Sequence, residues 1–286
     1  MILVVGGTGH LGRRVVQQLR ERGHSVRVMA RHAEVAGESA RAGAQIWPGD
    51  VRDPATVGAA MEGVRLCVSA VQGFAGLGRQ SPESVDRDGN RTLVDAAHRV
   101  GADVVMVSAV GAAPDHSQSL HRMKWAAEEY LRRSGVPWTV VRGTPFAETW
   151  ADVLREGRNR AGRIQVFGKG ENPITFVSVE DVAAAVVQAV EDPGLRGHVI
   201  EVGGPESLTL NAFARLVDPH HEPRHVPRAL LRVMATAARP VNPQLARLAR
   251  AAVEMDTSDM TFDSTASRTA YPWLPLHPVT ALPLQG

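Results

Sequence analysis

The segment GGTGHLG, residues 6–12, has the glycine spacing of a loop that binds phosphate. It contains the pattern G-x-G-x-x-G, in which the missing side chains let the backbone turn tightly and approach a pyrophosphate. The segment follows an apolar run and precedes a helical pattern, so free N–H groups at a helix N-terminus would face the anion. The alternative is a glycine-rich turn without a ligand. The residues predicted to bind a dinucleotide here are Gly6, Gly7, Thr8, Gly9, His10, Leu11 and Gly12.

The end of the second apolar run, in VMARH, indicates which dinucleotide is bound. An acidic side chain at this place would bind a free ribose 2′-hydroxyl, but this chain has Arg31 and His32. Both side chains can contact a 2′-phosphate, and the planar guanidinium of Arg31 can do so with two hydrogen bonds. The sequence therefore favours NADP(H) over NAD(H). The alternative is that Arg31 is only a solvated surface arginine.

Two further apolar runs end in residues that are placed to line this cofactor, because open α/β sheets bind ligands beyond the carboxyl ends of their strands. In GDVRDP, residues 49–54, Asp50 can accept a hydrogen bond from the adenine amino group, with Val51 beside it. The alternative is a turn or helix-cap role for the aspartates, since Asp53 precedes a proline. The residues expected to line the cofactor after the fourth strand are Ala70, Val71 and Gln72.

The elements that position these residues alternate between two periodicities as far as residue 142. Short apolar runs such as ILVV indicate strands buried on both faces, and apolar residues three or four apart indicate helices. Six strands with intervening helices and right-handed connections predict an α/β fold, a doubly wound parallel Rossmann sheet. The later elements expected are a helix near Val179, a strand in GHVIEVGG, a helix after the possible N-caps Ser207 and Thr209, and two amphipathic helices broken at Pro240 and Pro243.

This pattern divides the chain into two parts. We expect an NADP-binding Rossmann domain at residues 1–145, to which residues 174–204 return. A small C-terminal substrate-binding lobe is expected at residues 146–173 and 205–286. The two amphipathic helices could instead serve only to pack on the sheet or to form a dimer face, because apolar helical faces most often bury for stability.

Several segments together resemble the atypical short-chain dehydrogenase/reductases, and within them the NmrA-like, NAD(P)H-binding family. The segments are GGTGHLG, MARH, GDVRDP, VSAVG, MKWAAEEYLRRSGVPWTVVRGTPF, FVSVEDVAAAVV and EVGGPESLT. That family includes quinone oxidoreductases, isoflavone-reductase-type enzymes and redox-sensing regulators. The resemblance implies that Gly143, Thr144 and Pro145 lie near the nicotinamide. We interpret Asp181 in FVSVEDVA as a structural carboxylate at a helix start.

One residue departs from the pattern of the larger family, whose members carry Ser, Tyr and Lys with the spacing Y-x-x-x-K. Ser108 and Lys124 stand at the serine and lysine positions, but the tyrosine position holds Leu120, which cannot donate a proton. Tyr130 lies six residues beyond Lys124, on the opposite face of the helix, and does not replace the missing phenol. The catalytic candidates are therefore Ser108, Lys124 and a histidine close to them, His121.

Three interpretations of the proton supply remain open. In the first, Lys124 works with the cofactor, directly or through an ordered water, as the resemblance to isoflavone-reductase-type enzymes implies. In the second, His121 protonates a carbonyl, since it shares a helix face with Lys124. In the third, the site is chemically idle and Lys124 only holds the ribose hydroxyls. The corresponding structural alternatives are a surface lysine paired with Glu128, an exposed or capping His121, and a Ser108 that bonds only to the backbone.

Aromatic residues near the expected nicotinamide site are candidates for an apolar substrate wall. Phe146 and Trp150 follow the sixth strand, and Phe74 follows the fourth. Packing inside the lobe is an equally good explanation for these side chains.

Composition excludes several other classes of protein. The net charge is +2 and only 5% of residues are aromatic, so no nucleic-acid partner is expected. The single cysteine, Cys67, lies in an apolar run, which predicts a buried, inert thiol and a reducing compartment. No apolar stretch reaches the ~18 residues of a membrane span, and no signal segment is visible. We expect a cytoplasmic protein without membrane contact.

Other catalytic motifs are missing or interrupted. His220, His221 and His225 lie close to Glu222, but prolines interrupt the group and its spacing does not match a metal site. No G-x-S-x-G nucleophile elbow is present, and Gly12 is followed by arginine rather than by the lysine of a nucleotide triphosphatase.

These residues predict an NADP-dependent oxidoreductase that passes hydride to a small apolar carbonyl, quinone, enone or imine and relies on Lys124. One alternative is a non-catalytic, NADP(H)-sensing regulatory protein whose tail helices dock a protein partner. Another is a redox-neutral isomerase or epimerase that uses bound NADP. The expected partner is a small-molecule substrate, and the expected state is a monomer or homodimer.

Overall fold

The computed structural model describes residues 1–74, 76 and 80–285, which form two compact units. The first unit consists of Met1–Gly143, Val179–Val202 and Trp273–Pro275. The second unit consists of Thr144–Ser178, Gly203–Pro272 and Leu276–Gly286. The chain therefore leaves the first unit after the sixth strand of the sequence pattern, returns to it once for a helix and a strand, and touches it again near the C-terminus.

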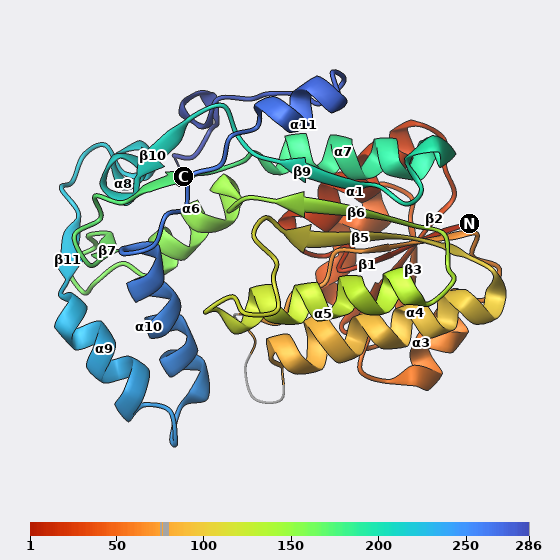
Figure 1. Cartoon of the computed structure of the whole chain (residues 1–286), viewed down its shortest axis with the longest axis horizontal. Coiled ribbons are helices and arrows are strands. Elements are labelled where there is room, and N and C mark those ends of the chain that lie inside the picture. Colours follow the sequence, from red (N-terminus) through yellow and green to blue (C-terminus); the bar gives the residue numbers. More distant parts are fainter. Residues whose placement is uncertain (75, 77–79, 286) are drawn as a thin grey trace. The chain divides into compact units, whose positions relative to one another are not determined.

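A seven-stranded parallel sheet is the frame of the first unit (Figure 1). Its strand order is β3-β2-β1-β4-β5-β6-β9, and all neighbouring strands run parallel. The strands are β1 (Ile2–Val5), β2 (Val26–Ala30), β3 (Gln45–Pro48), β4 (Leu66–Ser69), β5 (Asp103–Ala109), β6 (Trp138–Gly143) and β9 (Val199–Val202). The predicted doubly wound sheet is confirmed. Its order reverses between β1 and β4, where such sheets form their ligand crevice.

Helices cover both faces of this sheet, with α1 and α7 on one face and α3, α4 and α5 on the other (Figure 1). The helices of the unit are α1 (His10–Glu21), α2 (Gly37–Arg41), α3 (Pro54–Met61), α4 (Asp88–Val100), α5 (Ser119–Arg133) and α7 (Val179–Glu191). Short 3₁₀ turns occupy Ala33–Ala36 and Pro193–Leu195, and a π-helical turn, η2, occupies Pro82–Arg87. Each main helix buries the apolar stripe that its sequence showed; α1, for example, buries Leu11, Val15, Val16 and Leu19.

The thiol of Cys67 lies in β4, in the interior of the first unit. The residue is fully buried within the apolar core between the sheet and the helices α3 to α5. Burial raises the pKa of this thiol to about 12, so almost none of it is ionised at neutral pH. The predicted buried and inert thiol is confirmed.

The second unit is built from short strands and helices around its own apolar core. Phe176 and Phe213 stack at its centre with ring centroids 4.4 Å apart. Its strands are β7 (Gln165–Phe167), β8 (Pro173–Thr175), β10 (Ser207–Thr209) and β11 (Arg224–Val226), which pair as β10-β8 and β11-β7. Its helices are α6 (Ala147–Glu156), α8 (Leu210–Val217), α9 (Arg228–Ala237), α10 (Pro243–Met255) and α11 (Thr265–Ala270), with a 3₁₀ turn at Val279–Ala281. Across the described residues of both units, no helix combines the length and the apolar character needed to cross a bilayer.

The predicted helix boundaries in the second unit are partly confirmed. The hydroxyl of Thr209 accepts a hydrogen bond from the N–H of Ala212, 3.1 Å away, and so caps α8. Ser207 does not cap the helix, because it lies in β10, where its hydroxyl bonds to that of Thr175. The two amphipathic helices are α9 and α10, and the second begins at Pro243.

Candidate functional site

The glycine loop joins β1 to α1 at the reversal point of the sheet, and its glycines are required by close packing. Gly6 has a positive φ of 86°, and a Cβ at this position would lie 2.5 Å from the carbonyl oxygen of Ala70. A Cβ on Gly12 would lie 2.1 Å from the carbonyl oxygen of Gly6, so only glycine lets α1 start against the loop. Gly9 is exposed and is the N-cap of α1, and its N–H bonds to the carbonyl of Gly6. The N-terminus of α1 is thus open to solvent beside the glycine loop, an arrangement that fits a pyrophosphate.

The end of β2 carries the side chains that were predicted to select the cofactor. Arg31 and His32 are both exposed, and His32 lies 3.5 Å from the carboxylate of exposed Glu34. No carboxylate occupies the strand end itself, because β2 finishes at Ala30 and is followed directly by Arg31. Arg31 is therefore exposed at the place where a 2′-phosphate is expected.

The carboxylate of Asp50 already has a partner at the end of β3. Both of its oxygens accept hydrogen bonds from the guanidinium of Arg52, at 2.5–3.1 Å, and Oδ1 also accepts from the Arg52 N–H. These bonds, with a smaller contribution from the charge of Arg31, lower the pKa of Asp50. The hydrogen bond from adenine to Asp50 stays a prediction, and adenine would have to share the carboxylate with Arg52. Asp53 has the alternative role, since its side chain caps α3 through the N–H of Ala55.

The residues after β4 lie against the glycine loop, as their position in the sequence predicted. The N–H of Ala70 donates to the carbonyl of Val5, at the end of β1, with a length of 2.8 Å. Val71 is buried, and Gln72 is exposed. The backbone of this segment therefore lies beside the glycine loop at the carboxyl end of the sheet.

Lys124 lies beneath this segment and is not a surface residue. Its ammonium nitrogen is 2.8 Å from the carbonyl oxygen of Val71, 3.1 Å from that of Val107 and 3.0 Å from Oδ1 of Asp86. The side chain is buried, so the alternative of an exposed lysine paired with Glu128 is wrong. An ammonium has three N–H donors, and three protein oxygens surround this one. The contact with Asp86 is an ion pair rather than a hydrogen bond, since its Oδ1 accepts no hydrogen bond from the described residues. Contact with a cofactor or a substrate would compete with these interactions.

Asp86 completes the link between Lys124 and the loop after β4. It lies in the π-helical turn η2, is fully buried, and accepts a hydrogen bond from the N–H of Gly73 through Oδ2, at 2.8 Å. Burial raises the pKa of this carboxyl, although the charge of Lys124 and the bond from Gly73 act in the opposite direction. Lys124 and Asp86 together therefore fix the chain from Val71 to Gly73 to the ends of β4 and β5.

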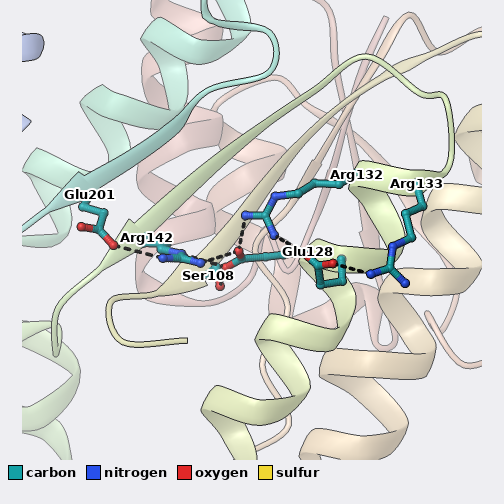
Figure 2. Close-up of polar contacts among 7 residues, drawn as sticks. Ser108, Glu128, Arg132, Arg133, Arg142 and Glu201 are labelled. Atoms are coloured by element: carbon teal, nitrogen blue, oxygen red, sulfur yellow. Dashed lines mark hydrogen bonds and ion pairs between the residues drawn. The ribbon is translucent and has the colours of Figure 1, made fainter. Parts of the chain in front are cut away.

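Ser108 at the end of β5 is bound to a second buried carboxylate. Its hydroxyl donates to Oε1 of Glu128, which is fully buried on α5. Figure 2 shows the same carboxylate between two guanidinium groups, those of Arg142 and Arg132. Arg142 donates to both oxygens of Glu128, at 3.0 and 2.7 Å, and also to Glu201. The alternative that Ser108 bonds only to backbone groups is therefore wrong, because its partner is a side chain.

This network ties α5 to β5, β6 and β9. Burial by itself would lower the pKa of Arg142, but its bonds to Glu128 and Glu201 outweigh burial and raise that pKa. The guanidinium is thus charged at neutral pH and balances the buried carboxylate. A catalytic role for Ser108 stays a prediction, and in this structure its hydroxyl proton is engaged with Glu128.

His121 lies one turn before Lys124 on α5 and is neither exposed nor a cap. Its ring stacks on that of His116, with centroids 4.0 Å apart, and the N-cap of the helix is Gln118. Its Nδ1 atom is buried and has no hydrogen-bond partner among the described residues. Burial, assisted by the charge of His116, lowers the pKa of His121 to about 4. The imidazole is therefore neutral at pH 7 and is a poor proton donor to a carbonyl.

The remaining predicted residues divide between the two units. Gly143 ends β6 in the first unit, where its carbonyl accepts from the N–H of Val110. In the second unit, Thr144 is buried with a hydroxyl that lacks a described partner, and Pro145 follows it. Phe146 forms a bridge to Val177. The aromatic ring of Trp150 packs against the core of that unit, whereas Phe74, in the first unit, is partly exposed; their role as a substrate wall stays a prediction.

The histidines near residue 220 have other partners. His221 bonds to Asp218, His225 bonds to the carbonyl of Gly168, and Glu222 pairs with Arg215. In the part of the chain that the structure describes, no three His, Cys, Asp or Glu side chains come together as metal ligands would.

Comparison with known proteins identifies the family. A family model described as NAD(P)H-binding matches residues 6–193, which include the glycine loop, Asp86, Ser108 and Lys124. The chain is also 31% identical over 210 residues to the NAD(P)H azoreductase of Xenophilus azovorans, covering 73% of this chain and 70% of that protein. The chain belongs to the NAD(P)H-binding family. The predicted membership of the NmrA-like, atypical short-chain dehydrogenase/reductases is thus confirmed.

One further sequence relative and one solved structure are also similar to this chain. The (4-alkanoyl-5-oxo-2,5-dihydrofuran-3-yl)methyl phosphate reductase of Streptomyces griseus subsp. griseus is 31% identical over 216 residues, covering 73% of this chain and 70% of that protein. An NADPH-dependent quinone oxidoreductase from Escherichia coli, solved with NADPH, matches with a TM-score of 0.73 over 98% of this chain and 97% of that one. Its sequence is only 20% identical, so this likeness shows the shared fold.

Sequence reasoning missed the buried partners of the candidate catalytic residues. Asp86 and the arginines that bind Glu128 were not singled out, and Glu128 was considered only as a surface partner of Lys124. One signal was present: Arg142 is a charged residue in the apolar strand sequence WTVVRG, and a charge there needs a buried counter-charge. No comparable signal marks Asp86.

The Glu128 network predicts a large effect on stability. We expect Glu128→Gln to lower the free energy of unfolding by about 3 kcal/mol, because it leaves two arginines without a buried counter-charge. Glu129→Gln on the same helix is the matched control, since Glu129 pairs with Arg132 and Arg133 at the surface. This substitution should lower the free energy of unfolding by less than about 1 kcal/mol. Urea unfolding of both variants measures the difference, and equal small losses would contradict the structural role of Glu128.

The pKa of His121 predicts a pH-dependent stability. In the unfolded chain His121 binds a proton with its ordinary pKa of 6.5, and in the folded chain its pKa is about 4. The stability is therefore fully present above pH 6.5 and falls as the pH drops toward 4. Between pH 6.5 and 5 the free energy of unfolding of the wild type should fall by up to about 2 kcal/mol more than that of His121→Gln. Urea unfolding at both pH values tests this. His98→Gln, at an exposed position, should show the same change in the free energy of unfolding with pH as the wild type. The same change in His121→Gln would contradict the lowered pKa of His121.

Proposed function

We propose that the protein is an NADPH-dependent reductase of small, largely apolar acceptors whose reduction needs no proton donor on the protein, with quinones as the first class to test. The observation that carries this proposal is an intact dinucleotide loop beside a site in which Leu120 replaces tyrosine and Lys124 is held by three protein oxygens. The azoreductase and quinone oxidoreductase similarities support the same reaction type.

The residues present fit a bound NADPH. Gly6 and Gly12 let the loop pack closely against Ala70 and the start of α1, which brings backbone N–H groups to the expected pyrophosphate position, and Arg31 offers an exposed guanidinium for the 2′-phosphate. When bound, this cofactor supplies a hydride from C4 of its nicotinamide. The chain's own task is to hold and orient the reactants, and the segment from Val71 to Gly73, fixed by Lys124 and Asp86, supplies one wall for that purpose.

The missing tyrosine restricts which acceptors react well. Hydride addition to a simple ketone leaves a strongly basic alkoxide, so a proton donor in the transition state contributes about 10²–10⁴-fold. Hydride addition to a quinone leaves a hydroquinone anion whose charge is spread over an aromatic ring, and water can protonate it afterwards. Hydride addition to a cationic imine gives a neutral amine and requires no proton. A site with Leu120 and a neutral His121 therefore suits quinones and cationic imines, with enones between these and ketones.

In this proposal Lys124 and Ser108 are positioning residues. Lys124 holds the carbonyls of Val71 and Val107, and Ser108 holds Glu128, which anchors α5. Direct proton transfer from Lys124 is the competing possibility, and it needs one of the three ammonium contacts to be broken.

The test is NADPH oxidation by purified protein with quinones, enones, cationic imines and ketones of similar size. We expect kcat/KM for a quinone to exceed that for a ketone by at least about 100-fold, the size of the missing general-acid contribution. We also expect NADPH to bind at least about tenfold more tightly than NADH, because Arg31 can form a charge-assisted contact with the 2′-phosphate.

Matched variants make the outcome specific. Arg31→Ala should remove most of the preference for NADPH and leave NADH binding unchanged, whereas Arg41→Ala, at another exposed arginine, should change neither. Loss of quinone turnover in His121→Gln would support the imidazole as proton donor instead. Tight NADPH binding without turnover of any acceptor would indicate a sensor or a redox-neutral enzyme, and a chain that binds no dinucleotide would contradict the whole proposal.

A further inference from the structure

Large exposed apolar side chains are concentrated on the hairpin of α9 and α10, residues 228–255. Eight such side chains are exposed in the described chain, and five of them lie on this hairpin. The most exposed is Val241, at 84%, in the turn between the two helices. The other four are Leu230 and Val233 on α9, and Leu245 and Leu248 on α10. Each helix therefore presents two apolar side chains, three residues apart, to solvent.

The same hairpin is strongly basic. It contains five arginines and one acidic residue, Glu254, and so has a net charge of +4, whereas the whole chain has +2 and the remainder is net negative. Arg232, Arg239 and Arg250 are exposed, and no acidic side chain among the described residues lies within ion-pair distance of them. A surface that combines exposed leucines and valines with unpaired arginines matches the interface of an anionic bilayer.

The hairpin is held in shape before it meets any partner. The two helices pack side by side (Figure 1), and Leu231 on α9 and Ala246 and Ala249 on α10 are buried. At the base of the hairpin, the guanidinium of Arg228 pairs with Asp256. The carboxylate of Asp256 also accepts hydrogen bonds from the N–H groups of Lys169 and Gly170 at 2.9–3.1 Å. The hairpin is thus anchored at its base, and the turn at Val241 lies at its other end.

We propose that the α9–α10 hairpin docks on an anionic phospholipid surface, with the turn at Val241 and the exposed leucines entering the headgroup region. The helices have 10 and 13 residues, too few to span a bilayer, so the hairpin lies at the interface. The sequence led us to expect no membrane contact because it contains no spanning segment, and this proposal revises that expectation for contact at the surface only. A second copy of the chain is a poorer occupant, because a two-fold contact would bring two basic surfaces together.

Co-sedimentation of the full chain with vesicles tests this proposal independently of enzyme activity. We expect binding to phosphatidylcholine vesicles that contain about 30% phosphatidylserine, no binding to phosphatidylcholine alone, and release at about 0.5 M salt. The double variant Val241→Ser/Leu245→Ser should weaken binding at least about tenfold, and so should Arg239→Gln/Arg250→Gln. Val100→Ser/Arg99→Gln, at exposed positions at the end of α4, is the matched control and should bind as the wild type does.

Circular dichroism and thermal unfolding of each variant confirm that the substitutions leave the fold intact. The proposal is overturned if anionic vesicles do not bind, if neutral vesicles bind equally, or if the hairpin variants bind as tightly as the control. Sedimentation velocity identifies the other occupant: a wild-type dimer that Val241→Ser/Leu245→Ser dissociates, without vesicle binding, would assign the surface to a second copy of the chain.

Discussion

One buried ammonium group holds the segment at the carboxyl ends of the central strands, where a dinucleotide would bind. Lys124 is only 5% exposed, and its charge is balanced by Asp86 and by two backbone carbonyls at the ends of neighbouring strands. Burying an ion pair is costly unless the remaining donors and acceptors are satisfied. Here the Gly73 N–H satisfies Oδ2 of Asp86, whereas Oδ1 has only the ion pair with Lys124. The position of the segment after β4 therefore depends on this pair.

A second buried carboxylate fixes the helix that carries the lysine. Glu128 lies one turn after Lys124 on α5 and binds Ser108 of β5 and Arg142 of β6. The two residues turn one face of α5 into a rigid polar connection to the sheet, whereas Leu131 and Ala127 pack in the apolar core. Ser108 and Lys124 stand at the serine and lysine positions of typical short-chain reductases, and in this structure both are engaged by protein partners. This engagement is consistent with a leucine at the tyrosine position.

The sequence was sufficient for the features that depend on local patterns. Short apolar runs, the 3.6-residue period and the glycine spacing predicted the sheet, its helices, the glycine loop between β1 and α1, and the buried Cys67. The three-residue strands of the second unit, such as β8 and β11, are too short to show a period, and α6 was not predicted. The partners of Lys124 and Glu128 come from distant segments, and no local pattern determines which buried charges meet. The contacts of Lys124 with Asp86, Val71 and Val107 were therefore visible only in three dimensions.

The measurement that tests this account most directly is single-turnover quinone reduction by Lys124→Met/Asp86→Asn with saturating NADPH. The paired substitution removes both charges, so that no unpaired carboxylate stays buried, and asparagine can still accept from the Gly73 N–H. If Lys124 positions the loop, NADPH affinity falls about tenfold, while the rate of hydride transfer at saturation falls less than about tenfold. A loss of about 10³-fold or more in that rate with unchanged NADPH affinity would show instead that Lys124 acts in the chemical step.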